Sequence, residues 1–323
     1  MRKLFVCAVL VAAAAVHPVR SQTTAWPEKP IRLIVPAGPG GPNDILARIV
    51  SQYLPATIGQ NIVVENRPGA GGGTAAKAVA GADPDGYTLL IGNTAVLAVI
   101  PSVSRNPGYD PITSFSAIIK LTDSMQVLVV SKDVPAKTVP ELIAYAKANP
   151  GKLNFASSGI GNLTHLAGEL LKVKAGIDIV HVPYKSDAES MTALLGGQVQ
   201  MMFGNSGVLA PFIRDGKVKV LAVTGDMRNG DFPELPTVAE AGVTGYVVTS
   251  FFGIVAPAGT PSAVIDKFNA ALNQQMAGGP LREALVRFGA DPKPSSPQEF
   301  AIFIANEARK WRATAEAAGV RID

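Results

Sequence analysis

The amino-acid sequence predicts an α/β protein of two lobes, each a mostly parallel sheet flanked by helices. Short apolar runs rich in β-branched residues alternate with segments of helical periodicity along most of the chain, a pattern typical of parallel α/β sheets. A strand, a glycine-rich loop and a helix follow one another near residue 35 and again near residue 157. A chain of 323 residues has room for two such units, since single domains have roughly 100–200 residues.

The apolar runs and the helical stripes place the individual elements. Strands are expected at 31–35, 61–64, 87–92, 126–131, 153–156, 179–182, 199–203, 218–223 and 251–256. The helix after the first glycine loop has apolar residues at 45, 46, 49, 50, 53 and 54, the stripe of a helix that lies on a sheet. The second loop leads into a similar stripe at 163, 166, 170 and 171, and further helices are expected at 138–148 and 263–277.

A long helix over 297–318 ends the chain. Ser296 and Glu299 have the spacing of a capping box, and Phe300, Ile304 and Trp311 lie on the face expected to be buried. Extended crossings near 121–131 and 244–255 would join the lobes. We therefore expect one lobe to comprise residues 26–122 and 246–323, and the other to comprise residues 123–245.

Residues 1–21 have the pattern of a secretory signal peptide. Arg2 and Lys3 precede an unbroken apolar stretch, and small residues follow near Ser21. The apolar stretch is shorter than the roughly 20 residues that span a bilayer, so we expect an exported, soluble protein. Cys7, the single cysteine, lies inside this segment, so the exported chain has neither a disulfide nor a cysteine metal site.

Charge argues against nucleic acid as a partner. The formal net charge is +4, but without Arg2, Lys3 and Arg20 the chain keeps 26 basic and 25 acidic residues, a balance of +1. No basic run or basic-aromatic stripe remains. A nearly neutral chain is compatible with a small acidic ligand.

The two glycine-rich loops are the strongest candidate for a binding site. A helix start exposes backbone N–H groups that lack partners, the helix dipole adds partial positive charge, and glycines let an anion approach. We therefore expect the free amides of both loops to hold one carboxylate between the lobes; the alternative is that each loop is only a tight turn. The candidate residues in the loops are Ala37, Gly38, Pro39, Gly40, Asn43, Asp44, Ser157, Ser158, Gly161, Asn162, Thr164 and His165.

Other site chemistries fit the sequence poorly. The first loop matches neither the G-x-G-x-x-G nucleotide fingerprint nor a Walker loop, because prolines and Asn43 interrupt it and no lysine follows. His165 and Glu169 share a helix face, but His181 is the only other histidine of the exported chain, so we expect no metal site. We expect neither a cofactor nor an enzyme, because the G-x-S-x-G elbow is absent; a serine hydrolase built on Ser157 or Ser158 with His165 stays the alternative.

The exported chain resembles the substrate-binding proteins of tripartite tricarboxylate transporters, the Bug receptors. The motifs that carry the resemblance include Glu65-Asn66-Arg67-Pro68-Gly69, Pro84-Asp85-Gly86-Tyr87, His181-Val182-Pro183-Tyr184-Lys185 and Leu195-Gly196-Gly197-Gln198-Val199. Matching stretches also lie at 26–31, 36–48, 156–159, 165–169, 236–242 and 252–261, in the same order and over nearly all of residues 26–323. Each motif is short, but the ordered set is specific.

The resemblance implies a periplasmic-binding-protein-like fold of type II and a site between the lobes. It adds Asn93, Thr94, Tyr184, Gly204 and Asn205 to the candidate ligand-binding residues. The sequence departs from the usual pattern at Ser186, where glycine is common, and at Gln200 and Gly204, where aspartate is common. The missing acid at 204 removes a partner for an amino or hydroxyl group, so we expect a plain carboxylate rather than an amino acid.

The function that follows is that of a periplasmic solute-binding protein. It would close on a small mono-, di- or tricarboxylate, aliphatic or aromatic, and deliver it as a monomer to the subunits of a tripartite tricarboxylate-type membrane transporter. A periplasmic hydrolase of carboxylate esters is the alternative from another functional class.

Overall fold

The computed structural model of the protein describes residues 26–322, apart from residues 185, 229, 231, 289 and 293. The expected signal peptide at 1–21 lies outside the described residues. No helix within the described part is both long enough and apolar enough to cross a membrane.

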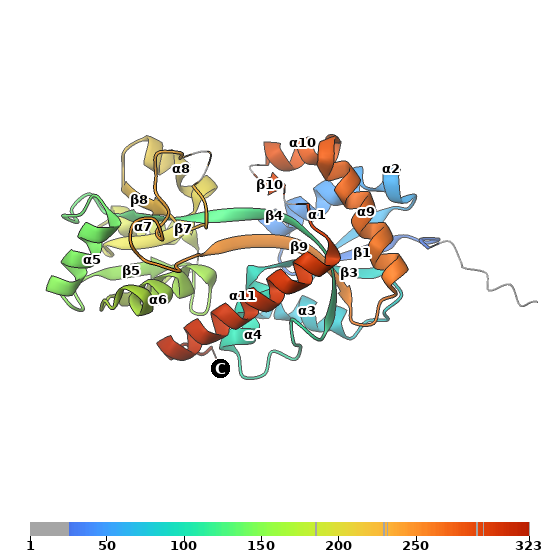
Figure 1. Ribbon diagram of the computed structural model, residues 1–323, viewed down its shortest axis with the longest axis horizontal. Helices are drawn as coiled ribbons and strands as arrows, with labels where there is room; N and C mark the ends of the chain where they lie inside the picture. Colours follow the sequence, from blue (N-terminus) through green and yellow to red (C-terminus); the bar gives the residue numbers. More distant parts are fainter. Residues whose placement is uncertain are drawn as a thin grey trace, which may run out of the picture.

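Two lobes share a continuous sheet whose strand order is β2-β1-β3-β9-β4-β7-β5-β6 (Figure 1). The strands β4 (Phe115–Val130) and β9 (Thr249–Pro257) run side by side, antiparallel, through the middle of the molecule. We call the part of the sheet that contains β1 the first lobe and the part that contains β5 the second lobe. This arrangement confirms the expected two-lobed α/β class.

The first lobe is built on three parallel strands, β1 (Ile31–Val35), β2 (Ile62–Asn66) and β3 (Thr88–Asn93). The helices of this lobe are α1 (Pro42–Tyr53), α2 (Pro55–Ile58), α3 (Gly73–Ala80) and α4 (Ile100–Val103). From the end of the chain come α9 (Ser262–Gly278), α10 (Pro280–Arg287) and the short strand β10 (Asp291–Pro292), which pairs with β4. Chain segments that are far apart in sequence therefore make one lobe.

The second lobe repeats the parallel arrangement. Here β5 (Asn154–Ser157) lies between β6 (Val180–Pro183) and β7 (Met201–Asn205), and β8 (Lys219–Val223) pairs with β4. The helices are α5 (Val139–Ala148), α6 (Leu163–Ala175), α7 (Asp187–Leu195) and α8 (Ser206–Arg214). In both lobes a glycine loop joins a central strand to a helix, at β1–α1 and at β5–α6.

Some apolar side chains of α1 pack into the core of the first lobe, and others face the space between the lobes. Leu46, Val50 and Leu54 are fully buried against the first-lobe core, which also includes residues from α9 and α10. Ile45 is only partly buried. Burial of a leucine-sized side chain contributes about 1.5–3 kcal/mol, so this packing fixes α1, and with it the glycine loop at its start.

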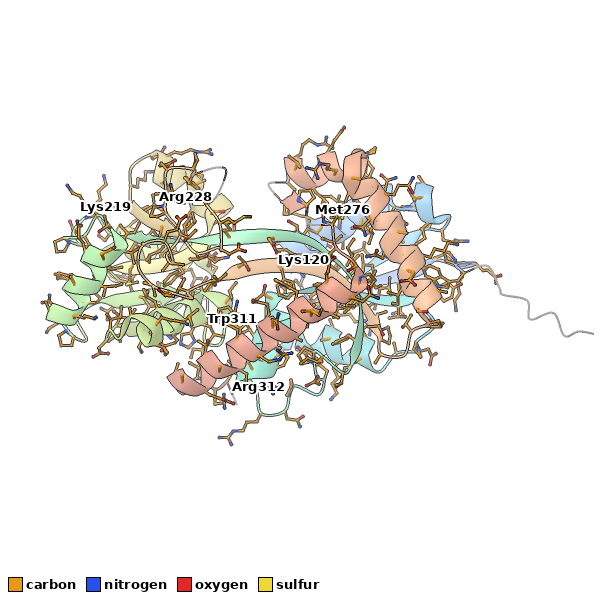
Figure 2. All side chains as sticks on the ribbon, viewed as in Figure 1. Lys120, Lys219, Arg228, Met276, Trp311 and Arg312 are labelled. Atoms are coloured by element: carbon orange, nitrogen blue, oxygen red, sulfur yellow. The ribbon has the colours of Figure 1, made fainter. Side chains whose placement is uncertain are left out.

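The helix α11 (Pro297–Ala318) connects the lobes on the side away from α8 and α10 (Figure 1). Its first half packs Phe300 and Ile304 into the first lobe, and its second half packs Trp311 and Ala315 against residues of α6. Figure 2 shows Trp311 on this second half. The capping box of Ser296 and Glu299 is present, as predicted.

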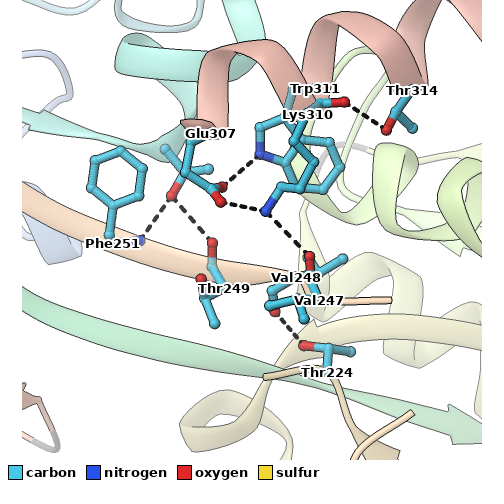
Figure 3. A network of polar contacts seen from close by, with 10 residues as sticks. Thr224, Val247, Val248, Thr249, Phe251, Glu307, Lys310, Trp311 and Thr314 are labelled. Atoms are coloured by element: carbon cyan, nitrogen blue, oxygen red, sulfur yellow. Dashed lines mark hydrogen bonds and ion pairs between the residues drawn. The ribbon is translucent and has the colours of Figure 1, made fainter. Parts of the chain in front are cut away.

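A polar network fastens α11 to the strand that returns between the lobes (Figure 3). The buried carboxylate of Glu307 accepts a hydrogen bond of 3.0 Å from Trp311 Nε1 and pairs with Lys310. Lys310 Nζ also donates to the carbonyl of Val247 at 3.2 Å, just before β9. The helix is therefore tied to the crossing strand by both packing and charge.

The expected strands and helices are present, with ends shifted by a few residues, except that one strand was placed too short. The strand expected at 126–131 is the second half of β4, which begins at Phe115. Register shifts near 117–122 show why its first half was missed: bulges interrupt the regular alternation of inward and outward residues. The division of the chain at 122/123 and 245/246 stays a prediction.

Candidate functional site

A cavity of about 610 Å³ lies between the two lobes. The first lobe and β9 line it with Gly40, Pro42, Ile45, Leu46, Ser250, Phe252, Phe288 and Ala290. The second lobe and β4 line it with Thr122, Asp123, Ser124, Gln126, Ser158, Asn162, Leu163, Thr164, Asp187, Asn205, Ser206 and Val208. The first turns of α1 and α6 therefore face a common space.

The first glycine loop is held in shape by Asp44. One carboxylate oxygen of Asp44 accepts hydrogen bonds of 2.9 Å from the N–H of Gly40 and from Arg48 Nε, and the other accepts from Asn66 Nδ2 at 2.9 Å. The Arg48 hydrogen bond, with help from Gly40 and Asn66, lowers the pKa of Asp44 to about 2. Gly40 has a φ of +84°, a conformation that glycine adopts without strain. Asp44 is thus a support of the loop.

Asn43, Asn93 and Thr94 form the layer behind this loop. Asn93 Nδ2 donates to Asn43 Oδ1 at 3.0 Å, and Asn43 is only 5% exposed. Thr94 Oγ1 accepts a hydrogen bond of 2.8 Å from the N–H of Phe251, which joins β3 to β9. These three candidate residues do not line the cavity, nor do Ala37, Gly38 and Pro39.

The second glycine loop is closed by its own side chains. Asn162 caps α6 by accepting from the N–H of Thr164 at 3.1 Å, and Thr164 Oγ1 accepts from the N–H of Ser158 at 3.0 Å. Ser157 Oγ accepts from the N–H of Gly159 at 3.2 Å. His165 Nδ1 accepts from the N–H of Gly161 at 3.0 Å. Four main-chain N–H groups in and next to this loop are therefore bound by side chains of the same segment.

Only some of the amides in the two glycine loops are free. The N–H groups of Gly40, Ser158, Gly159, Gly161 and Thr164 already have acceptors within the protein. Within the described chain, partners are lacking for the N–H groups of Asn43 and Asp44 at the start of α1, and of Leu163 and His165 at the start of α6. The backbone N–H groups that lack a partner are thus those in the first turns of the two helices, the positions where helices commonly bind anions.

A stacked histidine pair lies behind the second loop. The rings of His165 and His181 are 3.7 Å apart and nearly parallel, and Ser157 Oγ is 2.6 Å from His181 Nε2. Burial lowers the pKa of His165 to about 4, helped by Lys172. Burial, the neighbouring His165 and Lys172 lower the pKa of His181 to about 3. Both rings are neutral near pH 7, which leaves His165 Nδ1 free to accept from Gly161.

Acid should destabilise the fold through this pair. The pKa values of His165 and His181 in the folded protein lie below 6.5, the ordinary value for histidine, so the unfolded chain binds more protons below about pH 6.5. Their contribution is fully present above that pH and is lost as the pH falls towards 4. We expect the free energy of unfolding, measured with urea at pH 7.5, 6 and 5, to fall more steeply for the wild-type protein than for His181→Asn.

The comparison with His181→Asn separates the contribution of the His181 imidazole to the pH dependence of unfolding from the contributions of the carboxylates. Asp44 loses its own contribution in a lower window, between pH 3.8 and about 2, and every other carboxylate is common to both proteins. Parallel pH profiles for the two proteins would contradict the role assigned to the histidine pair.

The strands that join the lobes supply site residues that the sequence did not indicate. Ser124 Oγ accepts a hydrogen bond of 2.6 Å from Asn205 Nδ2, and Asp123 pairs with Lys120 Nζ at 2.8 Å. Figure 2 shows Lys120 near the middle of the molecule. Asp123 and Ser124 follow the last register shift of β4 and precede the strand expected at 126–131, so the sequence analysis did not include them. The floor of the cavity is polar as a result.

Asp187 is a further residue that the sequence analysis missed. It is the first residue of α7, which Ser186 caps by accepting from the N–H of Glu189 at 3.2 Å. Asp187 Oδ2 lies 3.5 Å from the N–H of Asn205, and Oδ1 is buried with no hydrogen-bond partner. Burial raises the pKa of Asp187, opposed by Ser158 and Asn205. Ser186 followed by Asp187 is a typical start of a helix, and this pattern could have indicated α7 and its first residue.

The acid missing at 204 does not leave the cavity without carboxylates, because Asp123 and Asp187 both line it. The argument for a plain carboxylate from that position therefore fails. A side chain at Gly204 would meet Leu209 at 2.7 Å, which gives the glycine a packing role. Gln200 pairs with Asn154 in the sheet through a hydrogen bond of 3.0 Å to the Asn154 N–H.

Of the candidate residues, the structure gathers Gly40, Ser158, Asn162, Thr164 and Asn205 around the cavity. Tyr184 borders a separate depression with Gln198. Phe252 both packs on the first-lobe core and lines the cavity. The remaining candidates, Asp44, Ser157, Gly161, His165 and Gly204, are buried outside the lining.

Ser157 and His181 do not form an accessible nucleophile. Ser157 is fully buried and lies outside the cavity lining, although its hydroxyl contacts His181. The hydrolase alternative paired Ser157 or Ser158 with His165, but His165 Nδ1 is occupied by Gly161. Among the described residues no group of three or more His, Cys, Asp or Glu side chains is arranged to hold a metal.

Comparisons with known proteins agree on one family. The family model described as the tripartite tricarboxylate transporter family receptor matches residues 46–320. The solved structure of R. palustris Rpa4515 with adipate is 35% identical, has a TM-score of 0.77, and covers 92% of this chain and 99% of its own.

Two further solved structures are similar over the same extent. The periplasmic binding protein BugD is 35% identical with a TM-score of 0.73, covering 92% of this chain and 99% of its own. MatC (Rpa3494) from Rhodopseudomonas palustris with bound malate is 31% identical with a TM-score of 0.73, covering 90% and 99%.

Proposed function

The chain belongs to the tripartite tricarboxylate transporter receptor family, and we propose that it captures a small carboxylate in the cavity between its lobes. The observation that carries the proposal is that the first turns of α1 and α6, each of which contains N–H groups without a partner, both line this one cavity, α1 at Pro42 and Ile45 and α6 at Leu163 and Thr164. Adipate and malate, the ligands of two relatives, are both dicarboxylates.

Neutral donors are sufficient to hold the anion. A hydrogen bond to a charged group contributes about 1.5–3 kcal/mol, so several amides and hydroxyls together can bind a carboxylate without an arginine partner. Ser158, Asn162 and Thr164 place polar side chains beside the α6 amides, while Ile45, Leu46 and Phe252 provide an apolar wall for the carbon chain. This mixture of apolar wall and few polar groups is typical of small-molecule sites.

Closure of the lobes would complete the site. Hinge closure around a ligand is the common mechanism of periplasmic binding proteins, and the ligand shifts the equilibrium only as far as it prefers the closed form. The long strands β4 and β9 and the helix α11 are the connections that must bend. We place the protein in the periplasm as a monomer that delivers its ligand to the membrane subunits of a transporter, without catalysis.

Ligand-induced stabilisation tests this function. A thermal-unfolding screen of mono-, di- and tricarboxylates should yield at least one that raises Tm by several degrees, since a ligand at about 100 times its Kd stabilises by roughly 2.7 kcal/mol. The matched control for each hit is its neutral diamide, which should have no effect because it lacks the charge that the helix first turns bind. Equal shifts by acid and amide, or no shift by any acid, would refute the proposal.

A further inference from the structure

One oxygen of the Asp187 carboxylate has no hydrogen-bond partner among the described residues. Oδ1 is buried and lacks a hydrogen bond, whereas Oδ2 lies at the long distance of 3.5 Å from the N–H of Asn205, and the carboxylate also interacts with the Ser158 hydroxyl. A buried polar atom without a hydrogen-bond partner destabilises the folded protein, and more so if it is charged. Burial also raises the pKa of this carboxyl group, the expected response of an acid that has lost its hydration.

The cavity wall contains no cation to compensate this acid. Its described lining residues include two carboxylates, Asp123 and Asp187, and no lysine, arginine or histidine. Lys120 pairs with Asp123 at 2.8 Å and also lies 4.1 Å above the ring of Phe303. Lys120 is therefore committed to Asp123, and Asp187 adds an acidic group without a cationic partner among the described lining residues to a cavity proposed to bind an anion.

Asp187 lies beside the part of the cavity where the ligand carboxylate is expected. Ser158 is near Asp187, as its effect on that pKa indicates, and Ser158 Oγ is 3.0 Å from Thr164 Oγ1 in the first turn of α6. All three residues line the same cavity. A carboxylate bound to the α6 amides thus has Asp187 for a neighbour, and repulsion between the two must be offset.

We propose that Asp187 selects ligands that carry a hydrogen-bond donor, a hydroxyl or an ammonium group, on the carbon next to the bound carboxylate. The donor would bind the Asp187 carboxylate while the ligand carboxylate binds the first turn of α6. Rotation about the final torsion of an aspartate is easy, so either oxygen can turn towards the cavity. This inference rests on the proposed function, since it assumes that the cavity binds a carboxylate.

Two ligand series test the inference by calorimetry. Each series holds the dicarboxylate length constant and varies carbon 2: succinate, malate and aspartate, and then adipate, 2-hydroxyadipate and 2-aminoadipate. In at least one series the wild-type protein should bind a 2-substituted acid at least tenfold more tightly than the unsubstituted acid, because hydrogen bonds to ionised groups are strong.

Substitutions at Asp187 separate the two donors. Asp187→Ala should abolish the preference for either substituent. Asp187→Asn keeps an acceptor oxygen but loses the charge, so it should retain the hydroxyl preference and reduce the ammonium preference at least tenfold. Glu189→Gln is the matched control, because it removes an acid from the same helical turn on a residue that borders a different depression. Glu189→Gln should leave the ratio of the affinities for 2-substituted and unsubstituted acids unchanged.

The results distinguish three failures. Wild-type protein that binds none of the acids refutes the proposed function, and the inference with it. Binding with equal affinities for 2-substituted and unsubstituted acids refutes the inference alone. Equal weakening of all ligands in Asp187→Ala also refutes it, since a protonated Asp187 that donates to the ligand carboxylate would then explain the binding. An unfolding temperature in Asp187→Asn no lower than that of wild type excludes misfolding as the cause.

Discussion

Asn162→Asp should weaken carboxylate binding at least a hundredfold while leaving the fold intact. Aspartate is nearly isosteric with asparagine and is an equally good N-cap, so the acceptor for the Thr164 N–H is kept. The new charge borders the cavity at the first turn of α6, where the ligand carboxylate is expected. Two unit charges about 4 Å apart repel by about 4 kcal/mol at an effective dielectric constant of 20. A hundredfold increase in Kd corresponds to about 2.7 kcal/mol, so roughly two thirds of this repulsion is enough.

Thr138→Asp is the control for this substitution. Thr138 is the exposed N-cap of α5 and accepts from the N–H of Glu141 at 3.3 Å, so the change adds the same charge to the same kind of cap outside the cavity. Calorimetry with the best ligand of the screen should give wild-type affinity for Thr138→Asp. Near wild-type affinity in Asn162→Asp would show that the carboxylate does not bind at α6.

Trp311→Ala should lower the free energy of unfolding by about 3–5 kcal/mol, the usual cost of deleting a buried tryptophan. Trp311 is fully buried where α11 packs on the second lobe, and its Nε1 donates to the buried Glu307. The substitution leaves both a void and an unsatisfied carboxylate oxygen. Urea unfolding followed by far-UV circular dichroism measures the loss without relying on tryptophan fluorescence.

Two variants accompany this measurement. Arg312→Ala changes the neighbouring residue, which is exposed, and should alter stability by no more than about 0.5 kcal/mol. Trp311→Phe keeps an aromatic ring but removes the N–H donor. Its loss of unfolding free energy should lie between those of Arg312→Ala and Trp311→Ala, and it can be measured even if Trp311→Ala fails to fold. A loss below about 1 kcal/mol for Trp311→Ala would mean that α11 does not help to hold the lobes together.

Local patterns in the sequence determined the element types and the two glycine loops that border the cavity. The stripe on α1, the capping box of α11 and the glycine loops after β1 and β5 each depend on residues a few positions apart, so the chain specifies them locally. The loops lie at the carboxyl ends of central parallel strands, and for this reason both face the space between the lobes. The ordered motifs also indicated the receptor family that the comparisons confirm.

Only the tertiary structure decided which loop groups are available to a ligand. Asp44, Thr164 and His165 appear in the sequence as polar residues near a helix start, yet in the fold their side chains occupy the amides of Gly40, Ser158 and Gly161. Asp123 and Asp187 reach the cavity from β4 and α7, far from either loop in sequence. Local sequence sets which groups exist, but long-range packing decides which donors are already paired and which charges converge, and the chemistry of the site depends on that pairing.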